Sequence, residues 1–144
     1  MAKRMYVIAA VAVLAVLTVF GASSEARVME FDHFSIDVPA GWQVEEDKEN
    51  YTVGFTAPDN SAALTVAVIE NEGMSLEEYA HGIQNELNGN NLQELEGGYM
   101  FEFTTANGVD SIGIVSGDDD MVMLLTIIGE HDDIDAMVNS MEGN

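Results

Sequence analysis

The 144-residue sequence contains no cysteine, and it has only four lysine and arginine residues against 26 aspartate and glutamate residues. The lack of cysteine excludes disulfide bonds, a thiol nucleophile, a cysteine-ligated zinc site and a lipid anchor on an N-terminal cysteine. The scarcity of basic side chains leaves little to stabilise an oxyanion or a phosphoryl group. A formal net charge of −22 makes nucleic acids and anionic membrane surfaces poor partners, because both would repel the chain.

The N-terminal stretch has the pattern of a secretory signal peptide. Two basic residues precede an apolar run over residues 5–20, and Ser24 and Ala26 stand at the −3 and −1 positions of a small-residue cleavage site. The sequence therefore predicts a signal peptide over residues 1–26 and a single domain over residues 27–144. An uncleaved membrane anchor is the alternative, since the run is close to the lower limit of about 17 residues for a spanning helix. Either outcome makes the domain periplasmic or secreted, with membrane contact only through this segment if it is retained.

Acidic residues are spread along the whole chain beyond the predicted cleavage site. Removal of residues 1–26 would leave Arg27 and Lys48 against 25 acidic residues in a chain of 118, a formal charge of −23. Such a surface could collect cations or dock a basic partner. Because the acids are not gathered in one block, we favour adaptation to a salty medium, in which the screening length falls to about 3 Å at 1 M salt.

Apolar residues at alternate positions predict a series of short strands. Turn residues such as Asn107-Gly108 and the Ser-Gly-Asp-Asp-Asp segment separate them. The last strand is apolar at nearly every position, so we expect layers on both faces of the sheet. The predicted strands are centred on residues 34–38, 42–44, 53–55, 64–68, 99–103, 112–114 and 121–129.

Helical spacing of apolar residues predicts two helices. The first covers residues 76–87, and Ser75 with Glu78 three positions later forms a capping box at its start. Gly89 is expected to take the left-handed conformation just beyond its end. The second helix, over residues 134–141, would supply a layer on the other face of the sheet.

The first predicted strand runs into a Pro-Gly-Trp corner. Phe34, Ile36, Pro39, Gly41 and Trp42 resemble the F-x-I-x-x-P-x-G-W opening of the PsbP/Mog-like superfamily and its exported bacterial relatives of unassigned function, including the DcrB-like proteins. The order of the predicted elements resembles that superfamily over nearly all of the chain after residue 26. The resemblance implies an α/β fold, with a mostly antiparallel sheet flanked by helices in an α/β/α sandwich.

Members of this superfamily include a photosystem subunit concerned with calcium and chloride retention and a nuclear-import factor that binds a small GTPase. No binding motif of either is matched here. The resemblance and the lack of a catalytic constellation together predict an exported, non-catalytic binding or protein-interaction domain. It would have a protein partner in the cell envelope and no cofactor.

Trp42 is the single tryptophan of the chain, and two roles are open to it. Pro39 would end the preceding strand, and Gly41 would permit a tight reversal. We expect the indole to fold back onto the sheet as a core anchor. The alternative is an exposed platform on which a ligand stacks.

Two acidic turns are the candidates for a metal site. Asp118 and Asp120 could clamp a cation, and His131, Asp133 and Asp135 could hold Ca²⁺ or Mn²⁺ through oxygen ligands and one imidazole. Neither turn matches the calcium-loop pattern. A solvated turn, and an acid-rich helix start capped by Asp133 or the aspartate before it, are therefore favoured. A divalent-cation-binding acidic scaffold remains the alternative function.

Other catalytic motifs are not matched. Ser111 lacks the first glycine of a nucleophile elbow and falls within a predicted hairpin. The Glu-Gly-Gly-Tyr-Met segment is not followed by the lysine and hydroxyl residue of a phosphate loop. His33 and His81 have no partner at metal-ligand spacing, so we expect both at the surface. The sequence therefore predicts no enzyme.

Overall fold

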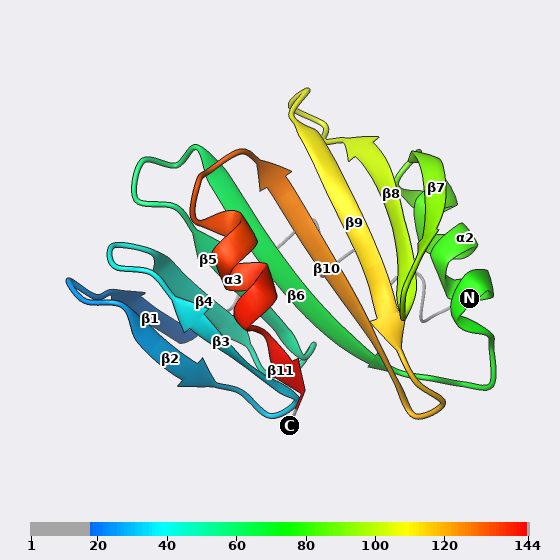
Figure 1. Ribbon diagram of the computed structural model, residues 1–144, viewed down its shortest axis with the longest axis horizontal. Coiled ribbons are helices and arrows are strands. Elements are labelled where there is room, and N and C mark those ends of the chain that lie inside the picture. The colour runs from blue at the N-terminus through cyan, green and yellow to red at the C-terminus, as the bar shows by residue number, and fades with distance from the viewer. Residues whose placement is uncertain (1–17, 144) are drawn as a thin grey trace.

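The structure is a computed structural model that describes residues 18–143 of the chain. An eight-stranded sheet forms its centre, and every neighbouring pair of strands is antiparallel (Figure 1). In spatial order its strands are β1 (Thr18–Ala22), β4 (Gln43–Asp47), β5 (Thr52–Thr56), β6 (Ala62–Glu70), β10 (Met121–Gly129), β9 (Asp110–Gly117), β8 (Gly98–Thr104) and β7 (Asn90–Leu95). A second, antiparallel sheet has the order β11 (Glu142–Gly143), β3 (Phe34–Val38) and β2 (Arg27–Glu30).

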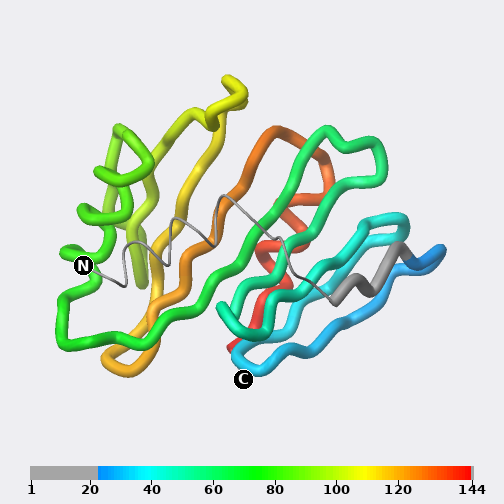
Figure 2. Tube along the Cα trace, turned by 180° about the vertical axis from the view of Figure 1, so that it is seen from behind, coloured from blue at the N-terminus to red at the C-terminus, as the bar shows by residue number. Residues whose placement is uncertain are grey.

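Two hydrophobic cores lie on opposite faces of the large sheet. Leu125 belongs to one and Leu124 to the other, because successive side chains of a strand point to opposite faces. The first core joins the large sheet to the three-stranded sheet and to α3 (Ile134–Ser140). The second joins it to α2 (Leu76–Glu86) through residues such as Ile83. Figures 1 and 2 show α2 beside β7–β9 and α3 on the other face of the sheet.

The expected mostly antiparallel sheet with helices on both faces is confirmed, but a plain α/β/α sandwich describes it only in part. Phe34, Ile36 and Val38 are buried against the large sheet and do not join it. Their strand, β3, forms the small sheet that shares one face of the large sheet with α3. Alternation along a strand shows that one of its faces is buried, but it does not show which sheet the strand joins.

The strands expected from alternation are present, whereas β1, β2, β7 and β11 were not predicted. β7 is polar and exposed at nearly every position, so it carries no alternating pattern. The capping box of Ser75 and Glu78 is confirmed at the start of α2. The prediction for Gly89 is wrong, because Asn88 takes the left-handed conformation, with φ of 55°. A Cβ on Gly89 would instead lie 2.8 Å from the Phe101 ring, so the glycine permits a close approach.

The predicted signal peptide stays a prediction, and its residues 1–17 lie outside the described part of the chain. β1 falls within the predicted segment 1–26 and pairs with β4. Cleavage after Ala26 would therefore remove β1 and leave β4 as the edge of the sheet. Among residues 18–143, no helix combines the length and the apolar character that crossing a membrane requires.

Candidate functional site

The Pro-Gly-Trp corner is a tight turn that buries its tryptophan. The Trp42 N–H donates to the Pro39 carbonyl at 3.4 Å, and Gly41 has a φ of +85°, as the third residue of a type II turn requires. A Cβ on Gly41 would lie 2.9 Å from Cγ of Pro58, in the β5–β6 turn. Trp42 is 0% exposed and belongs to the first core. The expected role of Trp42 as a core anchor is therefore confirmed.

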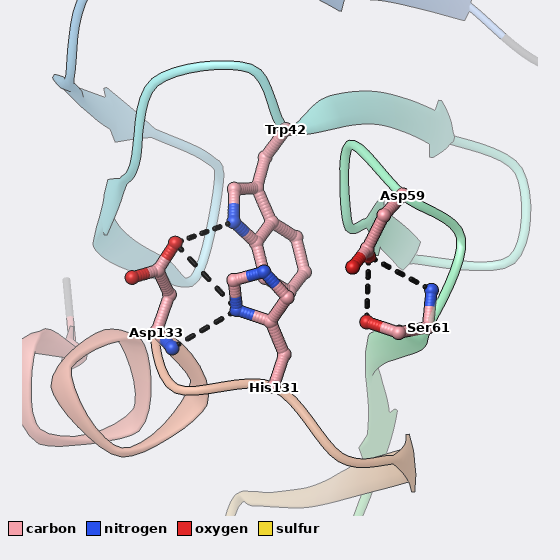
Figure 3. A network of polar contacts seen from close by, with 5 residues as sticks. All are labelled: Trp42, Asp59, Ser61, His131 and Asp133. Carbon is pink, nitrogen blue, oxygen red and sulfur yellow. Dashed lines mark hydrogen bonds and ion pairs between the residues drawn. The ribbon is translucent and has the colours of Figure 1, made fainter.

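The buried indole contacts the loop between β10 and α3 (Figure 3). Its Nε1 donates to Asp133 Oδ2 at 3.1 Å, and its ring meets the His131 ring edge-on at a centroid distance of 5.2 Å. The Asp133 N–H donates to His131 Nδ1 at 3.0 Å, and the Asp133 carboxylate lies 3.6 Å from the same nitrogen. Since Nδ1 accepts a hydrogen bond, a neutral His131 ring carries its proton on Nε2.

Asp133 occupies the N-cap position of α3, as expected, but its side chain makes no capping hydrogen bond. That part of the prediction is wrong, because the Trp42 indole takes the Asp133 carboxylate as its acceptor. Asp135 is exposed in the first turn of α3. The loop therefore uses its acidic residues to hold the tryptophan corner and to begin a short helix.

Asp59 and Ser61 form a second polar pair at this corner (Figure 3). The Ser61 hydroxyl and N–H both donate to Asp59 Oδ1, at 2.6 and 3.0 Å. These hydrogen bonds hold the pKa of Asp59 below its ordinary value. The Ser61 hydroxyl donates its hydrogen bond to the Asp59 carboxylate and not to a histidine. It therefore lacks the serine–histidine hydrogen bond of a nucleophilic site.

The turn between β9 and β10 holds the other predicted metal ligands, Asp118 and Asp120, both of them exposed. Asp118 Oδ1 accepts hydrogen bonds from the N–H groups of Asp120 and Met121, at 2.8 and 3.0 Å. Both hydrogen bonds favour the ionised form and lower the pKa of Asp118. The turn is exposed, as expected of a solvated turn, and its role as a metal site stays a prediction.

The two acidic turns lie at opposite ends of β10 (Figure 1). Nine strand residues separate them by roughly 30 Å, so they do not combine into one site. Within the described residues, no three His, Cys, Asp or Glu side chains are grouped so as to hold a metal ion. The divalent-cation alternative stays a prediction without geometric support.

The two remaining histidines differ in exposure. His81 is exposed on α2, 3.9 Å from Glu77, as a surface residue. His33 is half-buried, and its ring meets the Tyr51 ring edge-on at 5.5 Å. Glu46 lines a cavity together with His33 and is 9% exposed, although it is a carboxylate. The alternation of β4 indicates this burial, since Glu46 stands two positions after Val44, on the inward face of the strand.

Comparisons with known proteins identify the fold. The sequence matches no family model and no curated protein. The solution structure of cyanobacterial PsbP (CyanoP) from Synechocystis sp. PCC 6803 superposes with a TM-score of 0.56 over 91% of this chain and 99% of that one, at 11% identity. The protein has a PsbP-like fold. A crystal structure from Bacteroides thetaiotaomicron VPI-5482 also matches, with a TM-score of 0.56 and 13% identity, over 85% of this chain and 49% of that one.

The PsbP-like fold confirms the resemblance expected from the Phe34–Trp42 segment. At these identities the similarity concerns the fold alone, so no residue of either neighbour carries a role over to this chain. Within the PsbP-like fold, the Trp42 corner joins the large sheet, the β5–β6 turn and the start of α3. The corner is therefore a structural centre of the fold.

Proposed function

We propose that the protein is an exported, non-catalytic interaction domain that binds a protein partner in the cell envelope. The PsbP-like fold and the apolar N-terminal run support this proposal. The observation that carries it is an open apolar groove of about 270 Å³ between the β9–β10 hairpin and the C-terminal segment. Its apolar lining consists of Phe34, Ile114, Met123, Leu125, Val138 and Met141.

The groove lies on the face of the large sheet that is only partly covered. α2 covers one face of β8–β10, where Phe101, Val115 and Leu124 are buried. On the other face α3 covers β5 and β6, while Ile112 and Ile127 stay half-buried beyond it. Such an open apolar groove can accept the apolar side chains of a protein partner. An apolar segment of a partner would fill this groove and bury its side chains.

The experiment uses a partner captured from envelope extracts by crosslinking at high NaCl, then purified and titrated against the domain. Ile114→Asp, placed in the groove, should weaken binding by at least about ten-fold. Val28→Asp is the matched control, because Val28 is 66% exposed on β2 and does not line the groove. Circular dichroism should show that both variants are folded. Equal binding by the two variants would contradict the proposed surface.

A further inference from the structure

Glu46 is a buried carboxylate on a strand that faces the first core. It follows Val44 on the inward face of β4, opposite Val53 of β5, and it is 9% exposed. Within residues 23–143, whose side chains are described, its carboxylate has no hydrogen-bond or ion-pair partner. Neither carboxylate oxygen is fully buried, so a cation can reach the carboxylate and form a charge-assisted hydrogen bond with it.

A small inner cavity lies at this carboxylate. Its volume of about 20 Å³ has room for one group the size of a water molecule. An ammonium head group, –NH₃⁺, fits such a space more closely than the bulkier guanidinium or tetramethylammonium ion. The cavity is lined by Phe31, Asp32, His33, Phe34, Glu46, Tyr51, Val53 and Val68.

A larger outer cavity of about 690 Å³ shares His33, Tyr51 and Val68 with the inner one. Its wall combines apolar side chains, among them Ile69 and Met121, with carboxylates at Glu49 and Glu70. Among the described residues that line the two cavities, none is a lysine or an arginine. An alkyl chain can therefore lie along the apolar wall while the acidic residues attract its positive charge.

Tyr51 stands between the two cavities in an uncommon backbone conformation. Its φ is +50°, its carbonyl accepts a hydrogen bond from the Val68 N–H at 3.0 Å, and it is 53% exposed. The ring meets His33 edge-on. Residues with an uncommon backbone conformation are found more often at binding sites than elsewhere. The face of a solvent-exposed aromatic ring attracts cations.

We propose that Glu46 and Tyr51 form a binding site for a primary alkylammonium group, as carried by a lysine side chain or a free diamine. The ammonium would meet the Glu46 carboxylate in the inner cavity, with its alkyl chain along Tyr51, Val68 and Met121. A divalent cation fits less well, because Ca²⁺ takes six to eight oxygen ligands. The described residues offer no group of three acidic or histidine side chains for it.

Isothermal titration with n-butylamine, at about 1 M NaCl to screen general attraction to the acidic surface, tests the proposal. Wild type should bind saturably, and Glu46→Gln should lose at least about ten-fold in affinity. Glu45→Gln is the matched control, since Glu45 lies on the other face of β4 and the change in charge is the same. Tetramethylammonium should bind at least about ten-fold more weakly than butylamine.

Glu46→Gln keeps the shape of the side chain and breaks no hydrogen bond or ion pair among the described residues, so the variant should remain folded. Cadaverine and Nα-acetyl-lysine amide separate the two sources of the ammonium group. Tighter binding of cadaverine would assign the site to a free diamine. Tighter binding of Nα-acetyl-lysine amide would assign it to a lysine side chain of a protein. No binding of any amine, equal losses in the two glutamine variants, or equal binding of tetramethylammonium would overturn the proposal.

Discussion

The Trp42 indole Nε1 donates a hydrogen bond to Asp133 Oδ2 at 3.1 Å, across 91 residues of sequence. The contact ties the corner between β3 and β4 to the N-cap residue of α3. Both partners also meet His131, which lies edge-on to the indole and accepts the Asp133 N–H. Trp42 therefore links the layer formed by α3 and the small sheet to the large sheet through a hydrogen bond as well as through packing.

Substitution of Trp42 should separate packing from hydrogen bonding. Trp42→Ala should lower the free energy of unfolding by about 3–5 kcal/mol, because it removes a large buried side chain. Trp42→Phe keeps an aromatic ring but leaves Asp133 without its donor, so a smaller loss of about 1–3 kcal/mol is expected from the lost hydrogen bond. Urea unfolding measures both. Native fluorescence should be blue-shifted, and a red-shifted emission with unchanged stability would make Trp42 a surface platform instead.

Gly41 should be the more sensitive of two turn glycines with the same backbone conformation. Gly41 has φ of +85° and Gly108 has φ of +84°, so alanine at either position costs about 1–2 kcal/mol of backbone strain. Only at Gly41 would the new Cβ meet another group, Cγ of Pro58 at 2.9 Å, whereas Gly108 is open. Thermal unfolding should therefore show a larger loss for Gly41→Ala than for Gly108→Ala. Equal losses of stability would mean that the β5–β6 turn, which contains Pro58, moves aside without a measurable cost.

Asp118 should contribute stability in a defined range of pH. Its pKa in the folded protein is lowered from the ordinary value of 3.8, since its carboxylate accepts two backbone N–H groups. The ionised form therefore stabilises the fold above about pH 4, and this contribution is lost as the pH falls through the lowered folded-state pKa. This contribution is measured by comparing the melting temperatures of Asp118→Ala and Asp119→Ala at each pH.

Asp119 lies in the same exposed turn, and its replacement removes the same charge. At neutral pH, Asp118→Ala should melt at a lower temperature than Asp119→Ala. The two melting temperatures should converge well below pH 4. A difference that persists unchanged in acid would show that the ionised carboxylate is not the cause.

Salt should stabilise the protein by screening. A net charge of −22 places strong repulsion in the compact state, and an unfolded chain relieves it by expanding. We expect a broad rise of melting temperature with NaCl as the screening length falls from about 10 Å at 0.1 M to about 3 Å at 1 M. A melting temperature that does not respond to NaCl would contradict the salty-medium interpretation.

Micromolar Ca²⁺ should add little to the melting temperature once NaCl is high, because the two acidic turns lie at opposite ends of β10. A specific site would raise the melting temperature saturably even against that background. If such a rise occurred, Asp118→Asn and Asp133→Asn would show which turn binds the ion. It would also favour the divalent-cation alternative.

Local patterns of the sequence determined strands β3–β6 and β8–β10, the capping box of α2 and the turn at Gly108. Each depends on residues close together in the chain, where alternation, capping and left-handed backbone follow from local geometry. The Pro-Gly-Trp corner also carried the resemblance that the PsbP-like fold confirms. The charge, and with it the exclusion of nucleic acid as a predicted partner, came from composition alone.

Contacts between distant segments were decided only by the tertiary structure. The pattern of β3 showed a buried face but not the sheet it joins, and Asp133 was expected to cap a helix but accepts from Trp42. Glu46 lies at an inward position, yet whether a partner meets its carboxylate depends on which side chains β2–β3, β5 and β6 bring there. Such contacts depend on where each element packs, and that is settled by the burial of the whole apolar surface at once.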